Sequence, residues 1–329
     1  MSKRLRCVNF LLVIIVVISF SSCQKNDNPG SNNSSTTSNN IYVSGMEIEG
    51  QNFIPVFWKN GVRTQLGTNY SYTYDIFVSG SDVYVVGFEG LNTHYPVLWK
   101  NGVKTQLSTS PGEATSVFVS GSDVYICGTE TTGAFLWKNG VKTRYGSSSS
   151  GASCVFVKGY DVFIAGYNQR NGTTAATYWH NGVEPNFLPT TRSVGSSIFV
   201  SGSELYMIGK DLVTNLPALW RRTIGGSSNL HTQTPLSTKT NSNVTSISVL
   251  GTDTYIAGVE GGACYWKNGV RTQLSANSES TADKVFTIGT DFYIAGRGGN
   301  NLTAGYWKNG TRVELSSKPG SYATSVFVN

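Results

Sequence analysis

The feature that most constrains this chain is a short phrase, Trp-Lys-Asn-Gly, which recurs along its 329 residues. In residues 97–107 an apolar run leads into Asn-Gly, and a second run of alternating residues follows. Asn and Gly both tolerate the positive φ angles of a type I′ turn, so the phrase predicts a tight β-hairpin. It begins at Trp58, Trp99, Trp137, Trp266 and Trp307, and altered forms follow Trp179, where His180 replaces the lysine, and Trp220, where Arg221 and Arg222 replace Lys-Asn.

These residues are the seven tryptophans of the chain, and their spacing is nearly regular. Successive tryptophans lie 41, 38, 42, 41, 46 and 41 residues apart. A period of about 40 residues is typical of the blades of a β-propeller and not of a single β-sandwich. No helical periodicity accompanies it.

Each repeat reads as four short strands. Gly followed by Ser, Thr or Tyr separates the first two strands, and glycine at the first loop position is what a two-residue type II′ turn requires. This turn places Ser120 opposite Asp123 and Phe118 opposite Tyr125. In this unit the four strands are expected at residues 116–120, 123–127, 134–138 and 141–145.

Aromatic residues recur on the first two strands of each repeat. The second strands carry Tyr42, Tyr84, Tyr125, Phe163, Tyr206, Tyr255 and Tyr293. The first strands carry Phe77, Phe118, Phe156, Phe199, Phe286 and Phe327, and Ser248 interrupts the series. Because large rings bury much apolar area, we expect these two series and the tryptophans to pack between adjacent blades.

The two ends of the repeat region complement each other. Residues 41–45 form a second strand with no first strand before it, and residues 325–329 form a first strand with no second strand after it. Pairing them closes the ring and removes both open edges. The sequence therefore predicts an all-β domain at residues 41–329, a seven-bladed β-propeller of four-stranded antiparallel blades, closed by the C-terminal strand pairing with the N-terminal blade.

An apolar-Tyr strand that ends in glycine, followed about ten residues later by Trp, resembles the kelch-type β-propeller repeat over residues 41–329. The kelch family usually shows a double glycine after the second strand. Here Gly87, Gly128, Gly166, Gly209 and Gly258 stand alone, and only Gly298-Gly299 approaches the pair. The resemblance therefore implies the fold, and no partner is carried over residue by residue.

The N-terminus reads as a secretion signal. Lys3, Arg4 and Arg6 precede an apolar run at residues 10–20, and small residues then lead to Cys23. This resembles a bacterial lipoprotein, which implies that residues 1–22 are removed, that Cys23 is lipidated and that the protein is delivered to the outer membrane, periplasmic or surface-exposed. The alternative is an ordinary cleaved signal with an incidental cysteine.

Residues 23–40 follow as a polar tether rich in Asn, Ser and Thr, with a reach of about 20 to 25 Å. The formal net charge is +6, and residues 1–22 carry three basic and no acidic side chains, so the remainder carries +3. This mild, dispersed charge argues against nucleic-acid binding. Cys127, Cys154 and Cys264 occupy apolar strand positions, so buried free thiols are expected, with a Cys127–Cys154 bridge as the alternative.

One face of such a ring holds the tight turns within each blade, between strands one and two and between strands three and four; we call it the turn face. The other, the loop face, holds the variable loops between strands two and three and the connections between blades, which makes it the better candidate for a site. The exception is the long loop at residues 221–233 on the turn face, which contains His231.

Acidic residues recur on the loop face two positions after the second-strand glycine. They are Glu47, Glu89, Glu130, Asp211 and Glu260, with Asn168 and Gly298 in the other two blades. The functional interpretation is a polar rim that binds sugar hydroxyls or basic groups, with two or three of the acids facing solvent. The alternative is that each carboxylate accepts hydrogen bonds from the adjoining loop.

Aromatic residues gather in the loops and strand entries of the first two blades, and we interpret them as a stacking platform. They are Phe53, Tyr70, Tyr72, Tyr74, Phe88, Tyr95 and Tyr322, of which Tyr74 is expected in the core. Asp75 and Lys284 are the charged residues at a first-strand position held elsewhere by Ser or Cys, which predicts a channel lined by small residues and two charges. The candidate ligand-binding set is Glu47, Phe53, Tyr70, Tyr72, Asp75, Phe88, Glu89, Tyr95, Glu130 and Tyr322.

These features favour a membrane-anchored binding module for a glycan or an envelope protein, with a monomeric body, no cofactor and no catalytic activity. His94, His180 and His231 fall in different blades, so no metal site is expected. An envelope assembly scaffold is the first alternative. A carbohydrate-active enzyme, a glycosidase or lyase, is the second, because a ring of blades can bring Asp75 near a rim glutamate and so place two carboxylates together.

Overall fold

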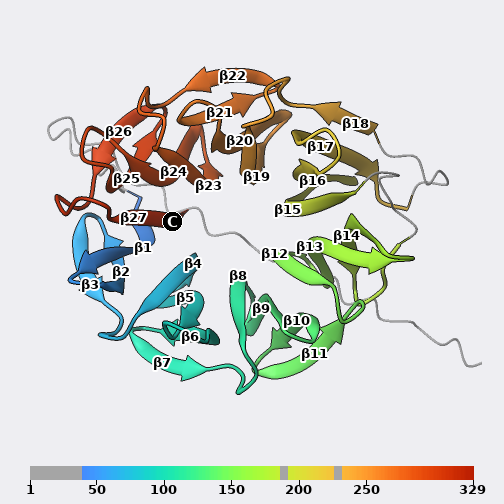
Figure 1. The fold of residues 1–329 in the computed structure, drawn as a ribbon, viewed down its shortest axis with the longest axis horizontal. Helices are drawn as coiled ribbons and strands as arrows, with labels where there is room; N and C mark the ends of the chain where they lie inside the picture. The colour runs from blue at the N-terminus through green and yellow to red at the C-terminus, as the bar shows by residue number, and fades with distance from the viewer. Residues whose placement is uncertain (1–38, 186–191, 226–231) are drawn as a thin grey trace, which may run out of the picture. The chain divides into compact units, whose positions relative to one another are not determined.

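A computed structural model of the chain describes residues 39–185, 192–225 and 232–329. Residues 39–329 form one compact unit. Its strands group into seven sheets arranged around a common axis (Figure 1). The seven sheets and the buried apolar clusters of the described residues all lie in this unit, as expected of a domain.

The blades follow one another in chain order, and the first strand of each lies nearest the axis (Figure 1). Blade one contains β27 (Tyr322–Val328), β1 (Ile41–Glu49), β2 (Asn52–Lys59) and β3 (Val62–Gln65). Blade two contains β4 (Ser71–Ser79), β5 (Asp82–Glu89), β6 (Tyr95–Lys100) and β7 (Val103–Gln106). Blade three contains β8 (Gly112–Ser120), β9 (Asp123–Glu130), β10 (Gly133–Lys138) and β11 (Val141–Tyr145). Blade four contains β12 (Gly151–Lys158), β13 (Asp161–Arg170) and β14 (Thr173–His180).

The remaining three blades have the same four-stranded plan. Blade five contains β15 (Ser193–Ser201), β16 (Glu204–Asp211), β17 (Leu216–Thr223) and β18 (Thr232–Pro235). Blade six contains β19 (Asn243–Leu250), β20 (Asp253–Val259), β21 (Ala263–Lys267) and β22 (Val270–Gln273). Blade seven contains β23 (Thr281–Ile288), β24 (Asp291–Gly298), β25 (Thr303–Lys308) and β26 (Thr311–Glu314).

The predicted fold is confirmed. The chain is a seven-bladed β-propeller of antiparallel blades, and β27 pairs with β1 from Ile41 opposite Val328 to Met46 opposite Tyr322. In blade four the outer edge is represented, within the described residues, by an isolated bridge between His180 and Val183. Residues 186–191 follow this bridge and lie outside the described part of the chain, as does His231.

The turns have the predicted conformations. In blade two Gly80 has a φ of 58° in the first turn, and Asn101 and Gly102 have φ values of 52° and 83° in the second. The side chain of Asn101 also acts: its Oδ1 accepts the backbone N–H of Val83 at 2.8 Å, and its Nδ2 donates to Asp82 Oδ1 at 2.8 Å. The same pair of bonds recurs at Asn139, Asn181, Asn268 and Asn309.

The lysine of the phrase has a structural role as well. Lys100 Nζ lies 2.8 Å from Asp82 Oδ2 and 5.1 Å from the centre of the Tyr84 ring. Hydrogen bonding from Lys100 and then from Asn101 lowers the pKa of Asp82. The lysine and asparagine side chains of Trp-Lys-Asn-Gly thus bond the end of a blade's third strand to the start of its second strand.

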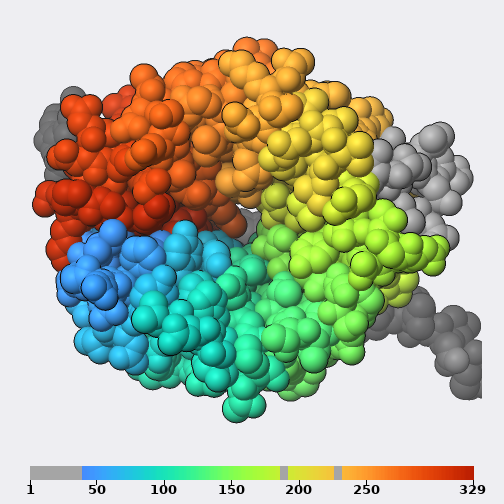
Figure 2. Space-filling model, viewed as in Figure 1, coloured from blue at the N-terminus to red at the C-terminus, as the bar shows by residue number. Residues whose placement is uncertain are grey.

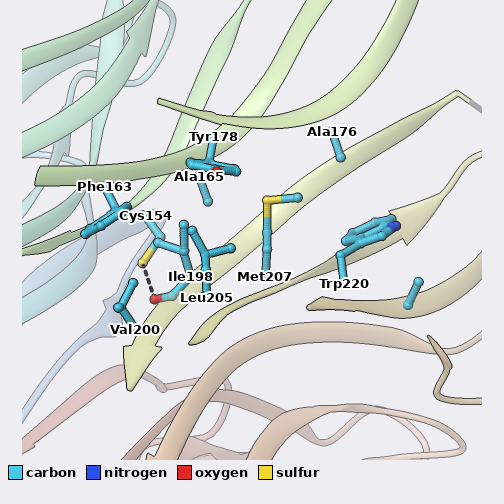
Figure 3. Close-up of a cluster of buried hydrophobic side chains, with 11 residues drawn as sticks. Cys154, Phe163, Ala165, Ala176, Tyr178, Ile198, Val200, Leu205, Met207 and Trp220 are labelled. Atoms are coloured by element: carbon cyan, nitrogen blue, oxygen red, sulfur yellow. Dashed lines mark hydrogen bonds between the residues drawn. The ribbon is translucent and has the colours of Figure 1, made fainter. Parts of the chain in front are cut away.

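Large rings fill the seven interfaces between blades. The seven tryptophans are each at most 2% exposed. Figure 3 shows one interface, where Phe163 and Tyr178 of blade four meet Met207 and Trp220 of blade five. Cys154 lies in the same cluster, and Cys127, Cys154 and Cys264 are all free and buried, so the expectation of free thiols is confirmed.

The first-strand phenylalanines are only partly packed between blades, which corrects the sequence prediction. Each contacts an interface cluster, but the six rings also contact one another around the axis and line a cavity of about 300 Å³. Figure 2 shows the surface hollowed where the innermost strands meet. Two-residue turns determine which face of a strand a ring occupies, but they do not determine whether that face meets a neighbouring blade or the axis.

A β-bulge in every first strand shapes the axial surface. In blade two the pairing passes from Thr73 to Asp75 and leaves Tyr74 without a partner in the strand ladder. Gly87 lies opposite, and a Cβ at that position would collide with the carbonyl group of Tyr72. The repeated second-strand glycine therefore permits the bulge.

Candidate functional site

An open groove with a volume of about 540 Å³ lies on the loop face. It extends from blade two across blade three to blade four. Nine residues line this groove: Asn92, Thr93, His94, Pro111, Gly112, Glu113, Thr129, Thr131 and Tyr167. We call it the Glu113 groove.

Glu113 lies at the start of β8, and both of its carboxylate oxygens have partners. The hydroxyl of Tyr74 donates to Oε2 at 2.7 Å, and Nδ1 of His94 lies 2.9 Å from Oε1. Burial, and then the adjacent Glu113 charge, raise the pKa of Tyr74, so this phenol keeps its proton and donates it. About a third of the Glu113 side chain and somewhat more of His94 remain exposed to the groove.

Aromatic rings support this network from below. The His94 ring stacks on Phe88 with centroids 3.7 Å apart, and Tyr72 stacks on the other side of the cluster at 5.9 Å from Phe88. Tyr74 contacts both Tyr72, at 4.9 Å, and Phe88, at 6.0 Å. The rings therefore hold the imidazole and the carboxylate in fixed positions, since each has several packed neighbours.

Three residues of the aromatic sector predicted from the sequence, Tyr72, Tyr74 and Phe88, pack together and support the Glu113 network. Phe88 is buried, whereas Tyr72, Tyr74 and Tyr95 are half-buried. Phe53 and Tyr70 form a separate pair with centroids 5.2 Å apart. The sequence-based set did not include the residues that contact the groove itself.

Glu113 and Tyr167 were missed because each has an unremarkable place in its repeat. Glu113 comes two residues before the bulge at Thr115 in β8, and Tyr167 follows the second-strand glycine of β13. A Cβ at Gly151 would lie 2.5 Å from the Tyr167 ring, so the absence of a side chain there lets the ring lie across β12. Their position in the repeat could have identified them, because the residues around each first-strand bulge and after each second-strand glycine lie at the loop-face end of the blade.

The recurring acids are mostly internal, and the expectation that two or three face solvent is wrong. Their buried members are Glu47, Glu130, Asp211 and Glu260, with 3 to 7% exposed. Glu47 lies 2.8 Å from Arg63 and 2.9 Å from Lys318. Burial alone would raise its pKa, but these partners and Ser316 outweigh burial and lower it.

The other acids repeat this arrangement with different partners. Glu130 pairs with Lys142 at 2.5 Å, and Glu260 accepts bonds from Ser237 and Ser242. Asp211 accepts the backbone N–H groups of residues 213 and 214. Glu89 is half-buried and held by Lys104 at 2.6 Å. The N–H groups, hydroxyls and basic side chains around these loops need acceptors, and the recurring acids supply them. Glu47 and Glu130 are not among the residues that line the Glu113 groove.

A second polar group lies where the channel opens on the loop face. Burial raises the pKa of the Asp283 carboxyl to about 6, although a hydrogen bond from Thr281 and the charge of Arg297 act in the opposite direction. The Arg297 guanidinium lies 4.3 Å from the centre of the Tyr322 ring. Asp283 and Tyr74 occupy the same bulge position in blades seven and two.

Asp75 is buried inside the channel and is not part of the groove. Its Oδ1 lies 3.1 Å from Lys284 Nζ, so the two charges that the sequence placed in the channel form an ion pair. Within residues 39–185, 192–225 and 232–329 no group of three or more His, Cys, Asp or Glu side chains is arranged to hold a metal ion. No helix in this part of the chain is long and apolar enough to cross a membrane.

The structure defines the class of the protein as a seven-bladed β-propeller. No family model matches the sequence, and no curated protein matches it. Among solved structures, a proposed 6-phosphogluconolactonase of Bacteroides uniformis is 11% identical with a TM-score of 0.51, covering 88% of this chain and 99% of that one.

Two further structures are more distant. The computationally designed protein Ika8 is 12% identical with a TM-score of 0.49, covering 86% of this chain and 90% of its own. A prolyl endopeptidase is 12% identical with a TM-score of 0.44, covering 76% of this chain and 43% of its own. At these identities the likeness concerns the fold and no activity.

Proposed function

We propose that this protein is a non-catalytic binding module for a polysaccharide, with its site in the Glu113 groove. The observation that carries the proposal is the groove itself, which is open and lined by polar side chains that can donate hydrogen bonds to the hydroxyl groups of a sugar and accept them. Asn92, Thr93 and Thr131 offer amide and hydroxyl groups, and Glu113 offers a charged acceptor. An open groove accepts the middle of a chain, whereas an enclosed pocket accepts only an end or a small molecule.

Tyr167 adds a ring at one side of the groove. It is half-buried, and it lies over Gly151, where no side chain competes for the space. A ring of this kind offers an apolar surface to the C–H face of a sugar while its hydroxyl remains available for hydrogen bonding. Tyr167 therefore takes the stacking role that the sequence assigned to the first two blades.

The composition of the groove supports binding without turnover. Glu113 is the one carboxylate among its nine lining residues, and it already accepts hydrogen bonds from Tyr74 and His94. Hydrolysis of a glycosidic bond by the usual route requires two carboxyl groups on opposite sides of the bond. The groove therefore supports the role of a binding protein and not of a glycosidase.

The proposal includes a lipid on Cys23 and attachment to the outer membrane; Cys23 lies outside the described residues. Its support is the N-terminal sequence. Asn40 hydrogen-bonds Asn329 beside the start of β1, on the turn face. The groove lies on the opposite face of the propeller from this junction. A kelch-like relationship, which rests on the repeat motif, is also part of the proposal.

The test is titration of the propeller body, residues 39–329, with a panel of polysaccharides by isothermal calorimetry and thermal melting. We expect at least one polysaccharide to bind and to raise Tm without being cleaved. Glu113→Gln and Tyr167→Ala should each weaken binding about tenfold or more, with Tm of the free protein nearly unchanged. Glu204→Gln, a carboxylate on the turn face, is the matched control and should bind normally.

Three results would contradict the proposal. Release of reducing ends would indicate an enzyme. The absence of binding throughout the panel would favour an assembly scaffold. Equal losses in Glu113→Gln and Glu204→Gln would place the site elsewhere.

A further inference from the structure

A second cavity opens on the turn face and is separate from the Glu113 groove. Its volume is about 300 Å³, and its upper wall is a ring of six phenylalanines, one from each of six blades. Consecutive rings contact each other with centroids 4.7 to 5.5 Å apart. The members of this ring, which we call the Phe funnel, are Phe286, Phe327, Phe77, Phe118, Phe156 and Phe199.

The Phe funnel has one gap. Blade six places Ser248 where the other blades place phenylalanine, and its hydroxyl lies 2.7 Å from Thr287 Oγ1. The six rings are half-buried, although apolar side chains at the centre of a domain are ordinarily covered. The funnel is therefore an apolar surface kept accessible on a rigid scaffold.

The floor of the funnel is polar, and its two charged groups differ in what they can still bind. The Asp75 carboxylate accepts five hydrogen bonds. The donors are the backbone N–H groups of Ile76 and Val117, the hydroxyls of Ser116 and Ser325, and the ammonium of Lys284. A carboxylate offers about four lone-pair positions, so Asp75 has no capacity left.

Lys284 is different. Its ammonium carries three N–H donors, and among the described residues Asp75 is the acceptor recorded for it. Burial acts to lower the pKa of Lys284, but the charge of Asp75, its hydrogen bond to the ammonium and the nearby thiols Cys154 and Cys127 together outweigh burial and raise it, so the lysine stays charged. Its side chain is 27% exposed, and it lines both the funnel and a smaller cavity of about 90 Å³ beneath it.

A neighbouring hydroxyl also lacks a partner. Ser246 in blade six occupies the same position of its first strand as Lys284 does in the neighbouring blade seven, and it lines the smaller cavity. It is 2% exposed, and its Oγ has no hydrogen-bond partner among the described residues. Buried hydroxyls are normally paired, so an unpaired one beside a charged lysine points to a group that is bound there.

We propose that the Phe funnel binds a small monocarboxylate with an apolar body. Its carboxylate accepts hydrogen bonds from Lys284, and its body lies against the phenylalanine rings. The faces of these rings would also attract a cation. The bottom of the funnel disfavours a cationic ligand. Lys284 has N–H donors that are still free there, whereas the Asp75 carboxylate has no free acceptor position.

The size of the cavity sets the size of the ligand. An engineered apolar cavity of about 150 Å³ binds benzene, and small-molecule sites begin at about 300 Å³. An eight-carbon acid fits this range. The negative charges of Asp75 and, once ionised, of Asp283 lie near the same lysine and repel a bound carboxylate. We therefore expect a modest affinity, with a Kd between about 10 μM and 1 mM.

The experiment compares octanoate, octanol and octylamine as probes of the propeller body by isothermal calorimetry at pH 7.5. We expect octanoate to bind at least fivefold more tightly than octanol, and octylamine to bind most weakly. Lys284→Met should remove the preference for octanoate over octanol, and Lys284→Arg should retain it. Ser248→Phe, which supplies the residue found in the other six blades, should weaken all binding about tenfold by filling the gap.

The variants also separate a binding defect from a folding defect. Lys284→Met leaves Asp75 without its counter-charge and is expected to lower Tm, whereas Ser248→Phe alters no buried ion pair and should melt like the parent. Tighter binding of octylamine than of octanoate would overturn the proposal. So would equal binding of octanoate and octanol by the parent, unchanged binding by Ser248→Phe, or no binding of octanoate at millimolar concentration.

Discussion

At the scale of single residues, a few departures from the repeat carry most of the chemistry. The axial position of the first strand holds serine in four blades, cysteine in one, and Asp75 and Lys284 in the other two. The bulge position beside it is serine or threonine in five blades and Tyr74 and Asp283 in the others. A closed ring brings such exceptions together, because all seven first strands face one axis.

Asp283 makes the stability of the protein depend on pH in a particular direction. Its carboxyl pKa is about 6 in the folded protein and 3.8 in its ordinary environment, so folding takes up a proton between these values. The free energy of unfolding should therefore fall as pH rises from about 4 to 7. Asp283→Asn, which resembles the protonated acid, should raise Tm by a few degrees at pH 8 and have little effect at pH 3.5.

Melting curves of the parent and the variant across this range check the prediction. Asp291→Asn in the same blade is the control. Hydrogen bonds from Asn309 and then Lys308 lower the pKa of Asp291, so its stabilising effect is present above pH 4 and lost below it. A variant at Asp283 that is less stable than the parent at pH 8 would show that the charged form is the one the fold prefers.

At the scale of the element, the outer hairpin is held by its turn. The asparagine of Trp-Lys-Asn-Gly adopts a positive φ, and its side chain bonds both an aspartate and a backbone N–H at the start of the second strand. The positive φ was implicit in the sequence, since Asn-Gly predicts the turn. The side-chain bonds were not predictable from it, because they join the third strand of a blade to the second across the sheet.

Asn139 tests this arrangement in blade three. Asn139→Ala should lower the free energy of unfolding by about 1–3 kcal/mol, since alanine disfavours the φ of 50° and cannot bond Val124 N–H or Asp123. Asn139→Gly keeps the conformation and loses only the bonds, so it should lose about half as much. Denaturant unfolding measures both.

The exposed Val141, in the same hairpin, provides the control. Val141→Ala should change the free energy of unfolding by less than about 0.5 kcal/mol. If Asn139→Ala were as harmless as Val141→Ala, the side-chain bonds of the turn would have no energetic role.

At the scale of the whole molecule, stability depends on closing the ring. β27 places Ala323, Val326 and Val328 in the cluster between blades seven and one, and Ser325 hydrogen-bonds Asp75 across 250 residues of sequence. Without β27, blade one loses its innermost strand and exposes both β1 and the cluster. A ring that lacks one contact has two open ends, so the loss affects more than one blade.

Deletion of residues 321–329 should therefore give a chain that aggregates or melts far below the parent. Light scattering after size exclusion and thermal melting measure the two outcomes. A peptide of residues 321–329 added in excess should restore part of the lost Tm, because it supplies the missing strand. A monomer that melts at the parent's temperature would contradict the closure of the ring by β27.

The tight turns explain why so much of the fold could be predicted. Two-residue loops such as Gly80–Ser81 and Asn101–Gly102 determine the register of their strands, and the tryptophan period counts the blades. Strand ends next to the axis were less predictable. β8 begins at Gly112, four residues before the expected start, since the bulge at Thr115 extends the pairing past the point where strict alternation ends.

The sequence by itself determined the number of blades, the hairpins and the strand that closes the ring, because these depend on short-range turn chemistry repeated at a fixed period. Only the tertiary structure decided which side chains meet. Glu113 reaches Tyr74 from the next blade, Lys284 reaches Asp75 past blade one, and six phenylalanines from six blades form one funnel. The physical reason is that such contacts depend on how far each blade is rotated about the axis and on where each bulge turns a side chain, and no local pattern records either.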